Sequence, residues 1–192
     1  MDSNNALAKS DLVAAYARTG EVESYSQLGA AIDWFRRSIA IAQELVRGAP
    51  GSVHYRGQLA TGSWQLADLL ARSGRRKEAL AYAQAAKKDL VELVRLQPAR
   101  RDFRRQLMTA HCLLCDLQRQ SRDRAGALAS QRAAMDLVAS VSAGQRDLYS
   151  DHSLAHRYDV FSRTDDKNSE EWRQKSRELW SRLEENGVRK KR

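Results

Sequence analysis

A unit of helical sequence recurs at intervals of 47 or 48 residues, and this recurrence constrains the fold more than any other feature. Leu12, Leu59 and Leu107 each stand near the start of an apolar helical pattern, with Leu154 as a fainter fourth. A small residue follows each leucine eight positions later, as Gly20, Ala67, Cys115 and Ser162. A fixed period of this length is typical of chains built from stacked copies of one supersecondary unit.

A second helix follows the first in each copy. These second helices open with Ala31-Ile32, Ala79-Leu80 and Ala127-Leu128, and Pro50 and Pro98 close two of the copies. Proline cannot continue the helical hydrogen-bond ladder, so each copy is a helix–turn–helix with a defined end. A single hairpin would leave an apolar face in water, and we therefore expect successive hairpins to stack.

The composition favours helix throughout the 192 residues. Only two prolines and ten glycines are present, and 30% of the residues are charged and interleaved with alanine and leucine. We predict an all-α, right-handed superhelical solenoid forming one domain over residues 1–187, with a basic tail at 188–192. The repeats are expected at about 6–50, 51–98, 99–144 and 145–187. The helices are expected at about 6–24, 30–47, 53–72, 76–96, 101–120, 124–141 and 147–162, with an eighth that Ser169 caps.

Two packing predictions concern the first helix. Its apolar residues Leu7, Leu12, Ala15, Tyr16 and Val22 are expected to form the buried stripe. The small residue Gly20 is expected where the first helix approaches its neighbour most closely. In the last helix, an apolar face is expected from Trp172, Leu179, Trp180 and Leu183.

These features resemble the tetratricopeptide repeat family. Its helix–turn–helix carries a small residue at the eighth position, matched by Gly20, Ala67 and Cys115, and alanine at the twentieth, matched by Ala79, Ala127 and, after one deletion, Ala31. The stretches Tyr55-Arg56-x-Gln58-Leu59 and Phe103-Arg104-x-Gln106-Leu107 match each other. The copies exceed the usual 34 residues by about thirteen or fourteen, so both helices are expected to be long.

The long copies also resemble arrays found C-terminal to some bacterial serine/threonine protein kinases. The closing stretch from Glu171-Trp172 to Leu179-Trp180 is similar to the end of such arrays, whereas no kinase motif occurs in this chain. This resemblance implies one alternative function, a regulatory or sensor domain of a longer bacterial signalling enzyme.

The family resemblance implies that the first helices line a concave groove for a peptide or a partner helix. Family members that grip a C-terminal carboxylate use lysine, asparagine and arginine there. Glu21, Asp68 and Asp116 stand where the asparagine would be, so no carboxylate clamp is expected. The groove residues implied by position are Ala14, Ala17, Arg18, Glu21, Thr61, Trp64, Gln65, Asp68, Arg72, Thr109, Cys112, Leu113, Asp116, Arg119, His156, Asp159 and Arg163.

Two of these groups have more than one interpretation. The acidic row could receive a basic peptide, or it could pair with arginines of the next repeat, such as Arg72 and Arg119. Trp64 could anchor a partner, or it could pack between neighbouring first helices.

No catalytic or metal site is predicted. The stretch His111-Cys112-x-x-Cys115 lacks the second ligand pair of a zinc site, and its cysteines fall in mid-helix, where core packing is expected. His152 and His156 lie one turn apart without a third ligand in register. No nucleophile stands with a base and an orienting group. We expect neither enzymatic activity nor a cofactor.

The net charge of +9 leaves a second alternative open, a nucleic-acid-associated adaptor. The densest basic stretches are Arg100-Arg101 with Arg104-Arg105 and the final Arg189 to Arg192. We expect these to be solvated, and the positive charge is spread along the chain. No signal-peptide pattern or membrane-length apolar stretch occurs, so the chain is expected in the cytoplasm. The preferred prediction is a non-catalytic protein-interaction scaffold, with self-association through end faces as a further possibility.

Overall fold

The structure, a computed structural model, is all-helical over the residues that it describes. These are residues 3–139, 151, 154–155, 158–159, 161–162, 165 and 168–187. Their helices are α1 (Ser3–Glu23), α2 (Leu28–Gly48), α3 (Val53–Arg72), α4 (Arg76–Leu96), α5 (Arg101–Gln120), α6 (Arg124–Ala139) and α8 (Ser169–Glu185), and no strand occurs among them. Within this described part, no helix has the length and apolarity needed to cross a membrane. The chain divides into an N-terminal unit, Met1–Leu117, and a C-terminal unit, Gln118–Arg192.

The helix boundaries follow the sequence prediction closely. The bounds of α3, α4 and α5 agree with the expected ones, and the other helices differ by up to three residues. The predicted capping role of Ser169 is wrong, because Ser169 is the first helical residue and Asn168 precedes the helix. The side chain of Asn168 makes no capping bond and instead donates to Asp165. The expected helix at 147–162 lies largely outside the described residues.

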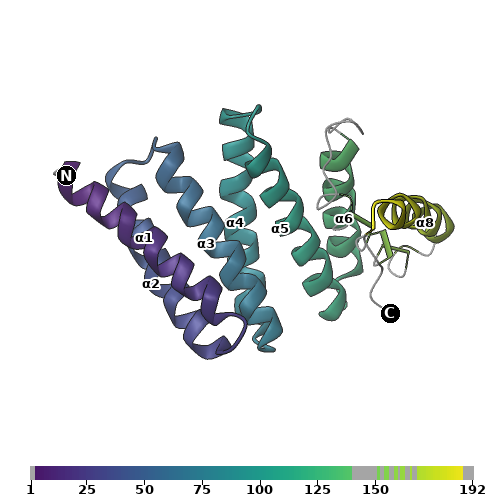
Figure 1. The fold of residues 1–192 in the computed structure, drawn as a ribbon, viewed down its shortest axis with the longest axis horizontal. Helices are drawn as coiled ribbons and strands as arrows, with labels where there is room; N and C mark the ends of the chain where they lie inside the picture. The colour runs from purple at the N-terminus through teal and green to yellow at the C-terminus, as the bar shows by residue number, and fades with distance from the viewer. Residues whose placement is uncertain are drawn as a thin grey trace. The chain divides into compact units, whose positions relative to one another are not determined.

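In the N-terminal unit, neighbouring helices pack as successive hairpins. α1 packs against α2, α2 against α3, and α3 against α4, as the sequence of ribbons in Figure 1 shows. One apolar cluster joins them and reaches α5, with Phe35 and Ile39 from α2, Leu66 and Leu70 from α3, and Leu114 from α5. The helical-repeat arrangement expected from the sequence is therefore present in this unit.

The small residues of the repeat lie where helices meet. A Cβ atom built on Gly20 would come within 2.8 Å of the Phe35 ring, which confirms the close approach of α1 to α2. Ala67 and Cys115, the equivalents of Gly20, are fully buried. Ala31 and Ala79 at the starts of the second helices are also fully buried. A larger side chain at these positions would overpack the contact between helices.

The predicted buried stripe of α1 is wrong in most of its members. Leu7, Leu12 and Val22 are 63%, 39% and 71% exposed, and Ala15 is exposed as well. α1 instead buries Val13 against α2. For Leu12, Ala15 and Val22 the reason is positional: their equivalents in α3 and α5 pack beside the preceding second helix, and no described helix precedes α1. Leu7 differs, because its equivalents His54 and Asp102 are not buried either.

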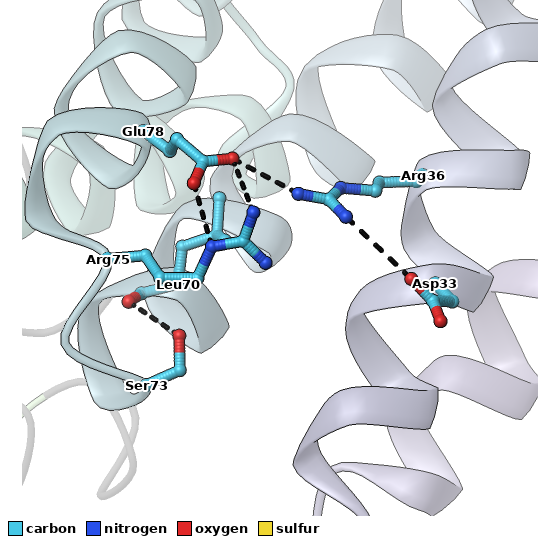
Figure 2. A network of polar contacts seen from close by, with 6 residues as sticks. All are labelled: Asp33, Arg36, Leu70, Ser73, Arg75 and Glu78. Carbon is cyan, nitrogen blue, oxygen red and sulfur yellow. Dashed lines mark hydrogen bonds and ion pairs between the residues drawn. The ribbon is translucent and has the colours of Figure 1, made fainter.

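A polar network also connects successive hairpins (Figure 2). Arg36 of α2 donates to the Glu78 carboxylate near the start of α4 at 3.1 Å and lies 3.7 Å from Asp33. Arg75 donates twice to the same carboxylate, at 2.7 and 2.9 Å. The hydrogen bond from Arg75, followed by the charges of both arginines, holds the pKa of Glu78 below its usual value. The network spans the junction between the first two hairpins on the side of their second helices.

In the C-terminal unit, α8 packs its apolar face inward as predicted. Leu179, Trp180 and Leu183 are buried, and Trp172 is half-buried. The Trp172 indole stacks on Tyr158, with ring centroids 5.9 Å apart. The charged residues of α8, by contrast, remain largely exposed.

Candidate functional site

A pocket of about 480 Å³ opens on the first helices of the N-terminal unit. It is lined by Val13, Ala14 and Ala17 of α1; by Val53, His54, Gly57, Gln58, Thr61 and Gly62 of α3; and by Gln97, Arg100, Asp102, Phe103 and Gln106 at and before the start of α5. Three helices that are far apart in sequence therefore contribute to one site.

The motif shared by the second and third repeats fixes the walls of this pocket. Arg56 and Arg104 occupy equivalent positions, and each donates to the carbonyl of the proline that ends the preceding hairpin, Pro50 and Pro98 respectively. Both carbonyls belong to the turns that follow α2 and α4. These bonds hold the start of each first helix against the end of the hairpin before it.

The glutamine of the same motif bonds to the preceding first helix in both repeats. Gln58 donates to the Ser10 carbonyl of α1 at 3.1 Å and accepts from the Ser10 hydroxyl at 3.2 Å. Gln106 of α5 accepts from the Thr61 hydroxyl of α3 at 3.1 Å. Because the Ser10 hydroxyl has one proton, His54 Nε2, 3.0 Å away, is the donor in their contact. Two polar contacts thus connect successive first helices beside the pocket, one between α1 and α3 and one between α3 and α5.

The charged groups that line the pocket neutralise each other. Arg100 donates two hydrogen bonds to Asp102, the first at 2.9 Å, and these bonds hold the pKa of Asp102 below its usual range. The Arg100 guanidinium also lies 4.4 Å from the centre of the Phe103 ring, at cation–π distance. An occupant would meet apolar surface and amide groups here, with little net charge.

Small residues give the pocket its depth. Ala14 and Ala17 supply only methyl groups from α1, and Gly57 and Gly62 supply none from α3. A Cβ atom on Gly57 would lie 3.3 Å from the Phe103 ring, and one on Gly62 would lie 3.2 Å from Ile39. The glycines let α3 approach its neighbours closely.

Of the predicted groove residues, the pocket contains Ala14, Ala17 and Thr61. The prediction missed His54, Gln58, Phe103 and Gln106, although the shared motif contained three of them. In the sequence, the two glutamines of this motif indicated only that the repeats match. The structure shows that each glutamine bonds to the preceding first helix.

The acidic row lies outside the pocket lining, and its first two members have partners within the unit. Gln65 donates to Glu21 at 2.6 Å. Arg72 lies 3.9 Å from Asp68 and donates to the Ser24 carbonyl at 2.9 Å. The Gln65 bond joins α1 and α3, whereas Arg72 pairs with an acid of its own helix rather than with one of the preceding repeat.

The other predicted groove residues have varied positions. Trp64 is half-buried, and its indole Nε1 has no hydrogen-bond partner among the described residues. The Thr109 hydroxyl donates to the Arg105 carbonyl within α5, and Asp159 accepts from Ser176 of α8 at 2.7 Å. Arg18 and Arg119 are exposed, Asp116 is half-buried, Cys112 and Leu113 are buried, and His156 and Arg163 lie outside the described residues.

The cysteine pair packs in the core, as predicted from its place in mid-helix. Cys112 and Cys115 are both buried and free of a disulfide. His111 beside them is largely enclosed, and burial, followed by the charge of Lys87, lowers its pKa to about 4. Across the described ranges, no three histidine, cysteine or acidic side chains are arranged to hold a metal ion.

Comparison with known proteins shows similarity at the level of the fold. No protein-family model and no curated protein sequence matches the chain. Among solved structures, the crystal structure of BtubC (BKLC) from P. vanneervenii is similar, with a TM-score of 0.70. The match has 16% sequence identity and covers 94% of this chain and 67% of that chain. At this identity the similarity concerns the helical fold alone, and it agrees with a helical-repeat architecture.

Proposed function

We propose that this chain is a non-catalytic protein-interaction module of the tetratricopeptide type, which binds a segment of a partner protein on its first helices. The observation that carries this proposal is the pocket shared by α1, α3 and α5. The first helices of successive repeats are the elements from which the family resemblance implies a binding groove.

The lining of the pocket indicates what kind of segment it suits. Methyl groups and the Phe103 ring offer apolar contact, while glutamine amides provide both donors and acceptors. Because Arg100 and Asp102 pair with each other, the pocket carries little net charge that could attract a charged peptide. A peptide with small apolar side chains fits this lining better than a strongly charged one, because the lining offers methyl groups and a ring while Arg100 and Asp102 pair with each other.

The experiment is a partner capture followed by affinity measurement with a blocking variant. Ala14→Tyr places a ring at the pocket, and Ala81→Tyr makes the same change at an exposed position of α4. We expect capture from a peptide library by the unmodified chain and by Ala81→Tyr, and an affinity reduced at least about tenfold in Ala14→Tyr. Equal binding by all three chains would contradict the proposal.

Two further variants map how far the binding surface extends. Trp64→Ala and Asp68→Ala lie on α3 beyond the pocket. A loss of binding in these variants would show that the binding surface reaches the acidic row. If the peptide contacts the pocket alone, both variants should bind it with unchanged affinity.

A further inference from the structure

The exposed side of α1 carries the same stripe that the later first helices bury. Its members recur at alternating intervals of four and three residues, so they align along one face of a helix. They are Ala8, Leu12, Ala15, Thr19 and Val22. All are exposed except Thr19, which is half-buried.

The equivalent residues of α3 and α5 show what this stripe does in the fold. In α3 they are Tyr55, Leu59, Gly62, Leu66 and Leu69, of which the last three are buried and the first two half-buried. In α5 they are Phe103, Leu107, Ala110, Leu114 and Leu117, all buried. At the first of these junctions, Gly62 faces Ile39 of α2 closely enough that an added Cβ would lie at 3.2 Å. The stripe is therefore a helix-packing face.

From this equivalence we infer that a second copy of the chain covers the α1 stripe, with the two α1 helices antiparallel. Two observations beyond exposure favour a second copy. The stripe is continuous in register with established helix-packing faces, and the charges beside it complement themselves under a twofold axis.

The charges select the antiparallel arrangement. Asp11 and Arg18 are both exposed on the same flank of the stripe, and neither makes an ion pair or a hydrogen bond through its side chain in the described structure. In an antiparallel pair, like flanks face each other, so Asp11 of one copy meets Arg18 of the other, twice by symmetry.

The exposed aliphatic side chains fit the same register. When Asp11 lies opposite Arg18 of the second copy, Leu7 lies opposite Val22, and the pair is centred between Ala14 and Ala15. Leu7 is 63% exposed and Val22 is 71% exposed, the highest values for a leucine and a valine among the described residues. Ala15, the small stripe residue at the centre, allows the helix axes to approach. Pairing would remove both side chains from water.

Because one helix from each copy makes the contact, we expect a weak dimer with micromolar affinity. Sedimentation equilibrium of the full chain from micromolar to millimolar concentration tests this. Val22→Glu puts a charge into the interface and should weaken dimerisation at least about tenfold. Val91→Glu, at an exposed valine of α4, is the matched control and should leave the dimer unchanged.

Charge exchange tests the orientation. Asp11→Arg and Arg18→Asp should each weaken the dimer, because each creates two like-charge contacts. The double variant restores both pairs with the signs reversed and should dimerise like the unmodified chain. A chain that stays monomeric throughout, a dimer insensitive to Val22→Glu, or a double variant no better than the singles would overturn the inference. None of these outcomes depends on peptide binding in the pocket.

Discussion

At the level of single residues, His111 makes the stability of the fold depend on pH. Burial beside Lys87 lowers its pKa to about 4, well below the value near 6.5 of an unfolded chain. Above about pH 6.5 the imidazole is neutral in both states. As the pH falls from there towards 4, the unfolded chain takes up a proton that the folded chain refuses, so folding stability is lost over this interval.

We therefore expect His111→Gln to lose less stability than the unmodified chain when the pH is lowered from about 7 to about 4.5. The difference should be about 1–2 kcal/mol after allowance for the partial exposure of the ring. Denaturant unfolding at several pH values measures it, and Lys87→Met, which removes the second cause of the shift, should fall between the two. Parallel curves for all three proteins would rule out this role for His111.

At the level of the helices, the sequence predicted the helix bounds well and the burial of the α1 stripe badly. The landmarks of α3, α4 and α5 gave their bounds, because proline and glycine interrupt the helices at defined positions. The stripe of α1 was recognised, yet its burial was not predictable from periodicity. A repeated face is buried only where another helix covers it, and α1 lacks a described helix before it.

The hydrogen bonds from Arg56 to Pro50 and from Arg104 to Pro98 stabilise two equivalent connections between hairpins. We expect Arg56→Ala and Arg104→Ala each to reduce the free energy of unfolding by about 1 kcal/mol, since each removes a hydrogen bond from a charged donor. The connections are one repeat apart, so the double variant should show the sum of both effects.

Thermal and denaturant unfolding measure these effects, with Arg105→Ala as the control. Arg105 lies on the exposed side of the same helix as Arg104, and its replacement should change stability by less than about 0.5 kcal/mol. Equal effects of the Arg104 and Arg105 variants would show that the carbonyl contact does not stabilise the connection.

At the scale of the whole chain, the charge of +9 predicts a general attraction to polyanions. Within the basic stretch before and in α5, Arg100 pairs with Asp102 and Arg104 bonds to Pro98, while Phe103 is buried. Two of the four arginines there thus act within the fold, and the aromatic ring inside this stretch, Phe103, is not offered to a base for stacking.

We expect any affinity for a random oligonucleotide to fall at least about tenfold between about 50 and 200 mM salt, equally for single and double strands. Fluorescence anisotropy at several salt concentrations measures this. A preference for one nucleic acid that persists at the higher salt would instead support the nucleic-acid adaptor.

The candidate site was less predictable than the fold. Its position on the first helices followed from the family resemblance, and Ala14, Ala17 and Thr61 were among the implied residues. Its polar contacts were not foreseen, because a glutamine that bonds across helices and a solvated glutamine look alike in sequence. Only the packing of α1, α3 and α5 brings Gln58 to Ser10 and Gln106 to Thr61.

The equivalence of the packing faces on α3 and α5 bears on how such a chain changes length during evolution. Deleting or duplicating a segment of 48 residues joins a second helix to a first helix of the kind it already contacts, so no new type of interface has to arise. An insertion of a few residues inside a helix rotates everything after it and breaks the match. Whole copies are therefore the steps in which this architecture can grow or shrink.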